Sequence, residues 1–182
     1  MLPSLKLTFL FIVLFMVVYP VSIWIIAQVG PNHGRGETIS VNNKVIGYKN
    51  EGQRFTDDKY FNGRPSATDY NAATSAGSNK GPSNPEYLQQ VQDRLDSFLI
   101  HNPSIKKESV PAELITASGS GLDPDLSFLG ASVQVARIAR ARNLSEKKLN
   151  DLIASQLEKP LFGFLGTEKI NVLKLNIALD AL

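Results

Sequence analysis

The sequence predicts an α+β protein in which one N-terminal transmembrane helix precedes a single small soluble domain. Three observations support this prediction: a charge-free apolar stretch near the N-terminus, a segment with strand periodicity after it, and recurring helix-capping residues after position 83. We expect residues 7–29 to span a membrane, residues 30–37 to form a flexible exit, and residues 38–182 to form the soluble domain. That domain should contain a short hairpin, a long ordered loop and three to four helices.

Residues 7–29 contain no charged side chain and are mostly Leu, Ile, Val and Phe. These apolar residues favour insertion into a bilayer by about 4 to 9 kcal/mol in total. At ~1.5 Å per residue the stretch is about 34 Å long, which is enough to cross a hydrocarbon core of about 30 Å. Pro20 should kink the helix rather than break it. A cleaved signal peptide is the alternative, but its apolar core usually has only about 7 to 15 residues.

The composition of the remaining chain excludes several classes of function. Without Lys6 there are 18 basic and 17 acidic residues, so the soluble domain is close to neutral. Nucleic acid is therefore not an expected partner, because its phosphates require a basic face. The absence of cysteine excludes disulfides, thiolate catalysis and Cys-zinc sites, and with two histidines we expect no metal centre. Basic residues flank both ends of the apolar stretch, so charge does not decide which side the domain faces.

The first part of the soluble domain should be a hairpin followed by a long loop. Residues 38–41 alternate polar and apolar side chains, residues 44–48 supply a partner strand, and Asn42-Asn43 between them tolerates positive φ. Residues 53–85 are rich in Gly, Pro, Ser and Asn and show no apolar period, yet they include four aromatic residues. We therefore expect an ordered, irregular loop pinned onto the core, and loops of this length are often functional.

Helical signals begin at Ser83, which with Glu86 matches a capping box. The first helix should present Leu88, Val91, Leu95, Phe98 and Leu99 on one apolar face. A second helix is predicted over 127–142, where Arg137 and Arg140 are expected to be solvated.

Asn143 suits the left-handed position at the end of that helix, and Ser145 should cap a third helix. Residues 170–182 could be strand or helix, and Asn171 as a cap with Leu173 and Ile177 spacing favours helix.

Three short motifs invite chemical interpretations. Asp123-Pro124-Asp125 could be a pair of catalytic carboxylates, but a turn before a helix capped by Ser127 is favoured. The Gly/Ser turns at 118–121 and 75–79 could cradle a phosphate through backbone N–H groups, although neither is followed by the Gly-Lys-Ser/Thr of a P-loop. Neither histidine is close in sequence to a candidate serine nucleophile, so a hydrolase is a weak hypothesis and we assign no catalytic residue.

Several stretches together resemble one protein family, in the same order along the chain. They are YFNGRPSA at 60–67, DYN at 69–71 with SAGSN at 75–79, GPSNP at 81–85, TASGSGLDP at 116–124, and GFLG at 163–166 with NVLKLN at 171–176. This pattern resembles the C chain of the bacterial high-affinity potassium-transporting ATPase, the Kdp system. The resemblance extends from the apolar stretch to the C-terminus.

The resemblance implies an accessory, non-catalytic subunit of an ATP-driven potassium uptake pump. In that family the partners are a potassium-channel-like A chain, a P-type ATPase B chain and a small F peptide. The family is described as a catalytic chaperone that raises the ATP affinity of the B chain, and its soluble domain is thought to lie outside the cytoplasmic (inner) membrane, with the N-terminus cytoplasmic. Such a domain has no cofactor of its own and meets ATP only through the complex. A membrane-anchored extracytoplasmic binding protein or hydrolase is the alternative.

Two sets of site residues follow from the resemblance. One stretch of the family has been likened to the signature loop of ABC transporters, which here implies nucleotide contacts at Ser75, Gly77, Ser78 and Asn79. Ala76 stands where that loop has a glycine, which puts direct contact with ATP in doubt. A partner interface is expected at residues from two segments: Phe61, Gly63, Arg64, Pro65, Ser118, Gly119, Ser120, Gly121 and Asp123. The alternative is that residues 53–85 only pack on their own core.

Overall fold

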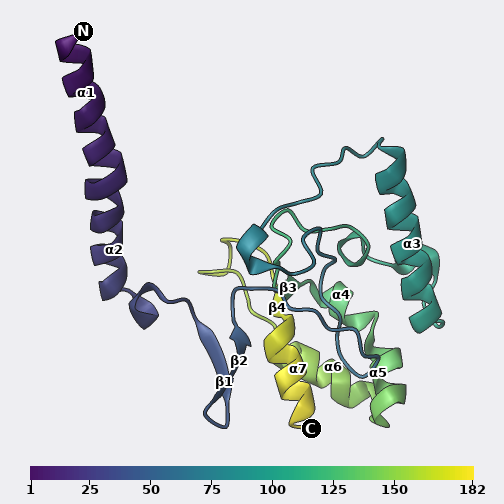
Figure 1. The fold of residues 1–182 in the computed structure, drawn as a ribbon. Coiled ribbons are helices and arrows are strands. Elements are labelled where there is room, and N and C mark those ends of the chain that lie inside the picture. The colour runs from purple at the N-terminus through teal and green to yellow at the C-terminus, as the bar shows by residue number, and fades with distance from the viewer. The chain divides into compact units, whose positions relative to one another are not determined.

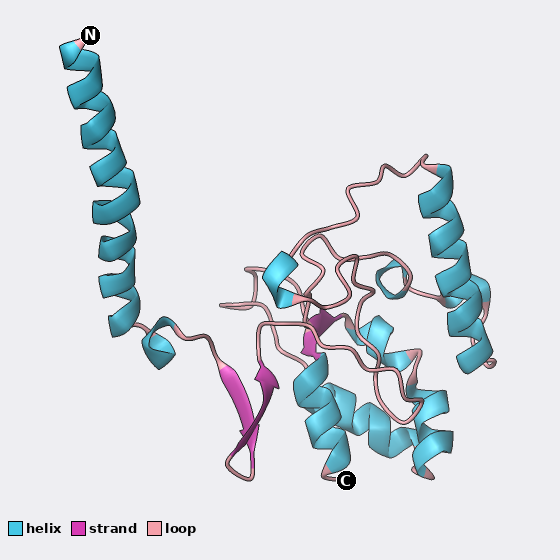
Figure 2. Cartoon of the chain, viewed as in Figure 1, coloured by secondary structure: helices cyan, strands magenta, loops and turns pink.

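The computed structural model describes residues 1–30 and 32–182 in full and Pro31 in its backbone only. The chain forms two compact units, Met1–Thr38 and Ile39–Leu182. Helices and two small two-stranded sheets are both present, which confirms the α+β class (Figures 1 and 2).

The N-terminal unit is dominated by one long apolar helix. It consists of α1 (Leu2–Val13), a π-helical turn η1 (Leu14–Val18) and α2 (Tyr19–Val29). The helix has a mean hydropathy of 2.7 over its most apolar window and buries none of it within the protein, so it is a candidate membrane span. Pro20 does not interrupt it, as predicted. The register widens just before this proline, where the Tyr19 N–H bonds the Leu14 carbonyl five residues back.

A short helical turn, η2 (Pro31–Gly34), follows, and the predicted hairpin comes next as β1 (Thr38–Val41) and β2 (Lys44–Tyr48). Asn42 and Asn43 have φ of 51° and 62°, the two left-handed positions of a tight two-residue hairpin turn. The hairpin prediction is therefore confirmed together with the reason for it.

The remaining elements are helices, short turns and one two-stranded sheet. They are η3 (Ala72–Thr74), α3 (Pro85–His101), η4 (Lys107–Ser109), η5 (Ala112–Leu114), β3 (Asp125–Leu126), α4 (Phe128–Ser132), α5 (Val135–Arg142), α6 (Glu146–Ser155), β4 (Ile170–Asn171) and α7 (Val172–Asp180). Strands β3 and β4 pair antiparallel, with Leu126 opposite Ile170. Residues 170–182 thus begin as a strand and continue as the favoured helix.

Local capping signals account for most helix ends. Ser127, Ser145 and Asn171 each accept a backbone N–H at the start of their helices, and Asn143 ends α5 with φ of 54°. The capping box predicted at Ser83 is wrong by one residue. Asn84 caps α3 by accepting the Tyr87 N–H at 2.9 Å, which places Pro85 at the first helical position.

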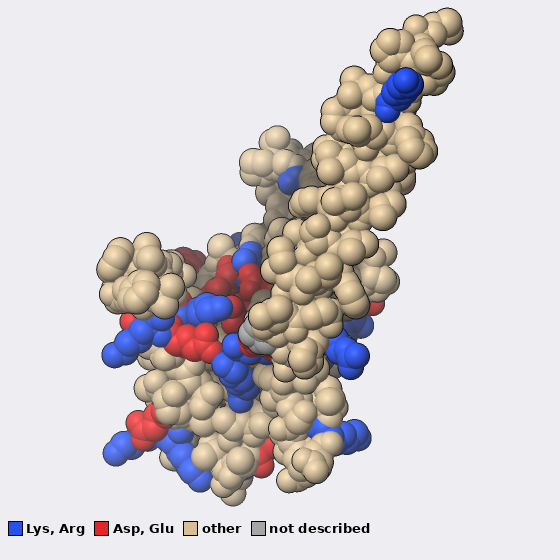
Figure 3. All heavy atoms as spheres, turned by 90° about the vertical axis from the view of Figure 1, so that its left-hand side faces the viewer, with Lys and Arg blue, Asp and Glu red and all other residues tan. Residues whose placement is uncertain are grey.

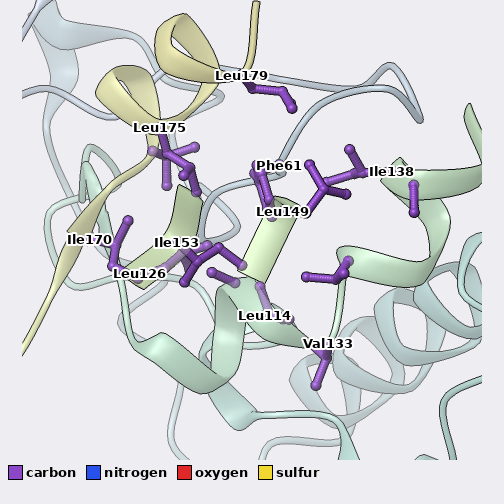
Figure 4. Packing of buried hydrophobic residues seen from close by; sticks show 14 residues of the cluster. Phe61, Leu114, Leu126, Val133, Ile138, Leu149, Ile153, Ile170, Leu175 and Leu179 are labelled. Atoms are coloured by element: carbon purple, nitrogen blue, oxygen red, sulfur yellow. The ribbon is translucent and has the colours of Figure 1, made fainter. Parts of the chain in front are cut away.

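The helix predicted over 127–142 is divided at Val133 and Gln134 into α4 and α5. The hydrophobic core lies between α4–α7, the small sheet, Leu114 of η5 and the loop residue Phe61, which is fully buried (Figure 4). Burying a side chain of this size stabilises the fold by about 1.5 to 3 kcal/mol. The long loop is therefore ordered because part of the core belongs to it.

Two buried amide side chains hold this loop by bonding its backbone. Asn176 of α7 accepts the Phe61 N–H and donates to the Phe61 carbonyl, both at 2.9 Å. Gln134 does the same for Asn62, accepting its N–H at 2.8 Å and donating to its carbonyl at 3.1 Å. The two amide side chains thus supply the hydrogen bonds that a neighbouring strand would otherwise give to a buried extended segment.

Arg137 was expected to be solvated, and this is wrong because its guanidinium lies inside the same network. Only 6% of the residue is exposed. It donates to the Asp58 carbonyl at 2.5 Å and to the side-chain oxygens of Asn62, Gln134 and Asn102 at 2.6, 2.8 and 3.1 Å. Burial lowers the pKa of Arg137, and the charge of Asp58 opposes that shift. Arg140 is exposed, as predicted.

Replacing Asn176 with Ala should lower the free energy of unfolding by about 2 to 4 kcal/mol, because both backbone groups of Phe61 lose their partner in a buried site. Thermal or urea unfolding of the full chain in detergent, followed by circular dichroism, measures this. Asn150→Ala on the exposed side of α6 is the matched control and should change stability by less than about 0.5 kcal/mol. Equal effects of the two variants would contradict the role given to Asn176.

Candidate functional site

The two Gly/Ser motifs of the sequence meet in the fold. The Ser118 N–H bonds the Pro65 carbonyl at 3.1 Å, and the Ser75 hydroxyl donates to the Ser120 carbonyl at 2.9 Å. A Cβ at Gly77 would lie 3.0 Å from the Gly119 carbonyl oxygen, so the two backbones are in close contact. We call the surface formed by residues 64–79 and 118–123 the loop–turn surface.

An ion pair fixes one end of the loop–turn surface. Arg64 Nη1 lies 3.0 Å from Asp123 Oδ2, with both side chains about a quarter exposed. The Tyr70 hydroxyl donates to the Arg64 carbonyl at 2.7 Å, and burial raises the pKa of that hydroxyl, which favours its donor form. The Asp123 carboxylate also accepts the Asp125 N–H at 3.0 Å, as a turn-forming aspartate does. Since Asp125 pairs with Lys169 at 2.7 Å, the two carboxylates have separate partners, consistent with the favoured turn.

Gly121 sits where a side chain would collide with the loop. Its φ is 69°, and a Cβ there would lie 2.5 Å from Thr68 Oγ1 and 2.8 Å from the Ala76 carbonyl oxygen. Glycine can take this φ and lie this close to the loop without strain, whereas a residue with a Cβ cannot. Gly119 contrasts with it, because a Cβ there would meet nothing within 4 Å.

The residues predicted for partner contact divide into interior and surface positions. Phe61, Ser118 and Gly121 are buried and shape the surface from behind. Gly119 and Ser120 are exposed at the turn, and Gly63, Arg64, Pro65 and Asp123 are partly exposed beside it. An interface role for these residues stays a prediction, with Gly119 and Ser120 as the positions that a partner could reach most directly.

The residues predicted for nucleotide contact lie at the same surface. Ser75 and Asn79 are exposed, and Gly77 and Ser78 are partly exposed. The Ser75 hydroxyl already bonds the Ser120 carbonyl, and Gly77 packs on Gly119. Nucleotide binding here stays a prediction, and the contacts show how the segment supports the loop–turn surface.

A separate cleft of about 450 Å³ lies beside α3 and was not foreseen from the sequence. Asp58, Asp93, Arg94 and His101 line it, so acidic and basic groups are mixed. His101 Nδ1 lies 2.8 Å from Asp58 Oδ1. The hydrolase hypothesis required this histidine to face Ser118 or Ser120, but the structure pairs it with Asp58. The two partners are separated by 43 positions, and no local pattern signals such a pairing.

An apolar N-terminal helix and a compact α+β domain together define a membrane-associated protein, with a single candidate span among the residues that the structure describes. Figure 3 shows the same division: the helix carries one basic group near its end, whereas the visible face of the domain mixes acidic and basic side chains. The chain belongs to the family described as K+-transporting ATPase, c chain, whose model matches residues 1–181.

Similar proteins from several organisms are each named as the potassium-transporting ATPase KdpC subunit. One from Flavobacterium psychrophilum is 57% identical over 178 residues, covering 98% of this chain and 96% of the relative. One from Bacteroides fragilis is 52% identical over 185 residues, covering 100% and 97%. One from Bacillus cereus is 43% identical over 182 residues, covering 99% and 94%. The chain is thus an accessory potassium-transport subunit by family, as the sequence resemblance predicted.

Gly121→Ala should lower the free energy of unfolding by about 2 to 4 kcal/mol, because it adds a left-handed alanine and an overpacked contact with the loop. Gly119→Ala, two residues away in the same turn, should leave stability within about 0.5 kcal/mol of the parent. Thermal unfolding of both full-length variants tests the pair. Similar melting temperatures for the two variants would mean that the loop does not pack on Gly121 in solution.

Proposed function

We propose that this chain is a non-catalytic accessory subunit of an ATP-driven potassium uptake pump, held in the bacterial cytoplasmic membrane by α1–α2, with its soluble domain outside. The observation that carries the proposal is the match of residues 1–181 to the family of K+-transporting ATPase c chains. The part of the chain that the structure describes holds a single candidate span, which supports an accessory role because one helix cannot enclose an ion path.

The expected partners are the potassium-channel-like A chain, the P-type ATPase B chain and the small F peptide. In this proposal the apolar helix packs among the membrane helices of the pump and the loop–turn surface contacts a partner outside. The rigidity of the loop–turn surface supports that role. Gly121, the Arg64–Asp123 ion pair and the Ser75–Ser120 hydrogen bond hold the shape of this surface before any partner binds. A surface that is already ordered loses less conformational entropy on binding.

The outward placement determines how the chain could raise the ATP affinity of the B chain. ATP is cytosolic, so a domain beyond about 30 Å of hydrocarbon cannot share a nucleotide with that chain. The effect would be a coupling free energy transmitted through the membrane helices, and a tenfold change in affinity requires only ~1.4 kcal/mol. The chain then needs no cofactor of its own and meets ATP only through the complex.

Deleting residues 1–29 should abolish co-purification of the tagged soluble domain with the A and B chains from cells grown at limiting potassium. Without the helix, the domain has no membrane segment that can pack among the membrane helices of the pump. The full-length tagged chain is the control, and growth at low potassium is the second readout. If the truncated domain restored growth, the helix would not be the assembly element.

Gly119→Trp tests the loop–turn surface in the same co-purification. A Cβ at this position meets nothing within 4 Å, so we expect the chain to fold normally but to recover at least about tenfold less of the pump, a loss that corresponds to ~1.4 kcal/mol of binding. Gly119→Ala is the matched control and should assemble like the parent. Normal assembly of the Trp variant would place the partner contact elsewhere on the domain.

Sidedness is tested with protease added to intact spheroplasts of cells that carry the complete pump. We expect the soluble domain to be digested from outside while a cytosolic marker protein survives, because the proposal places residues 38–182 beyond the membrane. Lysed spheroplasts provide the control for cleavage of the assembled domain. Protection in intact spheroplasts together with digestion after lysis would reverse the proposed orientation.

A further inference from the structure

Residues 158–169 form a small hairpin that the proposed function does not use. Its stem is closed by two backbone bonds between Glu158 and Lys169, at 2.8 and 3.1 Å. A second pair of bonds, both 2.9 Å, joins Leu161 and Leu165 near the tip. The hairpin projects from the body of the soluble domain as the yellow-green loop beside β3 and β4 (Figure 1).

The tip of this hairpin, residues 160–167, is apolar and exposed. It contains no charged residue. Leu161, Phe162, Phe164 and Leu165 are 64, 79, 75 and 51% exposed. Four adjacent large apolar side chains in water are costly, and such a patch on a soluble domain marks a contact surface.

The tip is also held rigidly in a strained shape. Phe162 has φ of 55° and Gly163 has φ of 81°, and the left-handed conformation is strained for a phenylalanine. The stem is tied to the domain by Lys174–Glu158 and Lys169–Asp125 ion pairs, both 2.7 Å. The Lys174 hydrogen bond holds the pKa of Glu158 below its ordinary value, so this tie persists at mildly acidic pH. Strain and exposure both weaken the free domain, so they indicate that the tip serves a contact.

The tip forms several of its own backbone hydrogen bonds. The N–H groups of Leu161, Gly163, Phe164 and Leu165 bond carbonyls within residues 160–165. Each internal bond lowers the cost of moving this segment into a layer with less water, because the bonded N–H and C=O groups no longer need hydration. Aromatic and leucine side chains are also the residues that settle at the boundary between headgroups and acyl chains.

A bilayer is always close to this domain, because the same chain carries the candidate span. Only residues 30–37 separate α2 from β1, and eight residues reach at most about 28 Å. A short tether gives an effective concentration in the millimolar range, so a contact that would be negligible for a free domain becomes occupied.

We propose that residues 160–167 insert into the interfacial layer of the bilayer that holds the N-terminal helix. This second, shallow membrane contact fixes how the domain is oriented above the membrane. It needs no other protein, so it stands or falls separately from the pump function proposed above.

The test uses the full chain, reconstituted alone in phosphatidylethanolamine–phosphatidylglycerol vesicles. Trp24, the single tryptophan, is replaced by Phe, and tryptophan is then introduced as Phe162→Trp or Phe164→Trp. We expect blue-shifted emission and strong quenching when the vesicle lipids carry bromine on the upper acyl chain. Phe128→Trp, at an exposed aromatic position at the start of α4, is the matched control and should be neither shifted nor quenched.

Three outcomes would overturn the proposal: no quenching at either tip position, equal quenching at the Phe128 position, or a blue shift that appears only when the other pump chains are added. The last outcome would assign the tip to a protein partner. Leu165→Trp places the fluorescent probe in the same tip but not in the left-handed turn. Its emission therefore still tests the proposal if the variant at Phe162 fails to fold. Circular dichroism of each variant confirms folding before its emission is interpreted.

Discussion

The soluble domain depends on the way Asn176 and Gln134 bond the backbone at Phe61 and Asn62. These two amides let an irregular segment enter the core without a partner strand, and Phe61 then fills the space between the helices. Arg137 joins the same network with four donor bonds, so the loop, α5 and α7 are held as one unit. Removing any one amide would leave buried polar groups without partners, which is why the network behaves as a whole.

Local rules predicted much of this fold, and long-range partners account for what they missed. The Asn42-Asn43 turn, the Ser145 cap and the left-handed Asn143 follow from residues within a few positions of one another. The one capping error arose because Ser83 and Asn84 are adjacent cap-type residues and Pro85 decides between them. The burial of Arg137 was not predicted because its partners Asp58 and Asn62 lie 79 and 75 positions away in the sequence. The apolar periodicity of a helix carries no information about partners so distant.

The candidate site shows the same limit. Each Gly/Ser motif was recognisable as a turn, yet the contact of Ser75 with Ser120 spans 45 positions and became visible only in the fold. In the fold the two turns form one surface, joined by the Ser75–Ser120 hydrogen bond and by the close approach of Gly77 to Gly119. A rigid, nearly neutral domain on a short tether suits a subunit that acts by contact. Because the chain belongs to the family of K+-transporting ATPase c chains, such a contact would serve potassium transport.

The π-helical turn at Leu14–Val18 has a consequence for the N-terminal helix as a packing element. One additional residue in a turn rotates everything beyond it by about 100° around the helix axis. A stripe of side chains that begins on α1 therefore does not continue along α2, and the helix presents two offset seams instead of one. A partner helix that followed the whole length would therefore meet one face before Leu14 and a different face after Val18. Under the proposed function, α1 and α2 could each contact a different membrane helix of the pump.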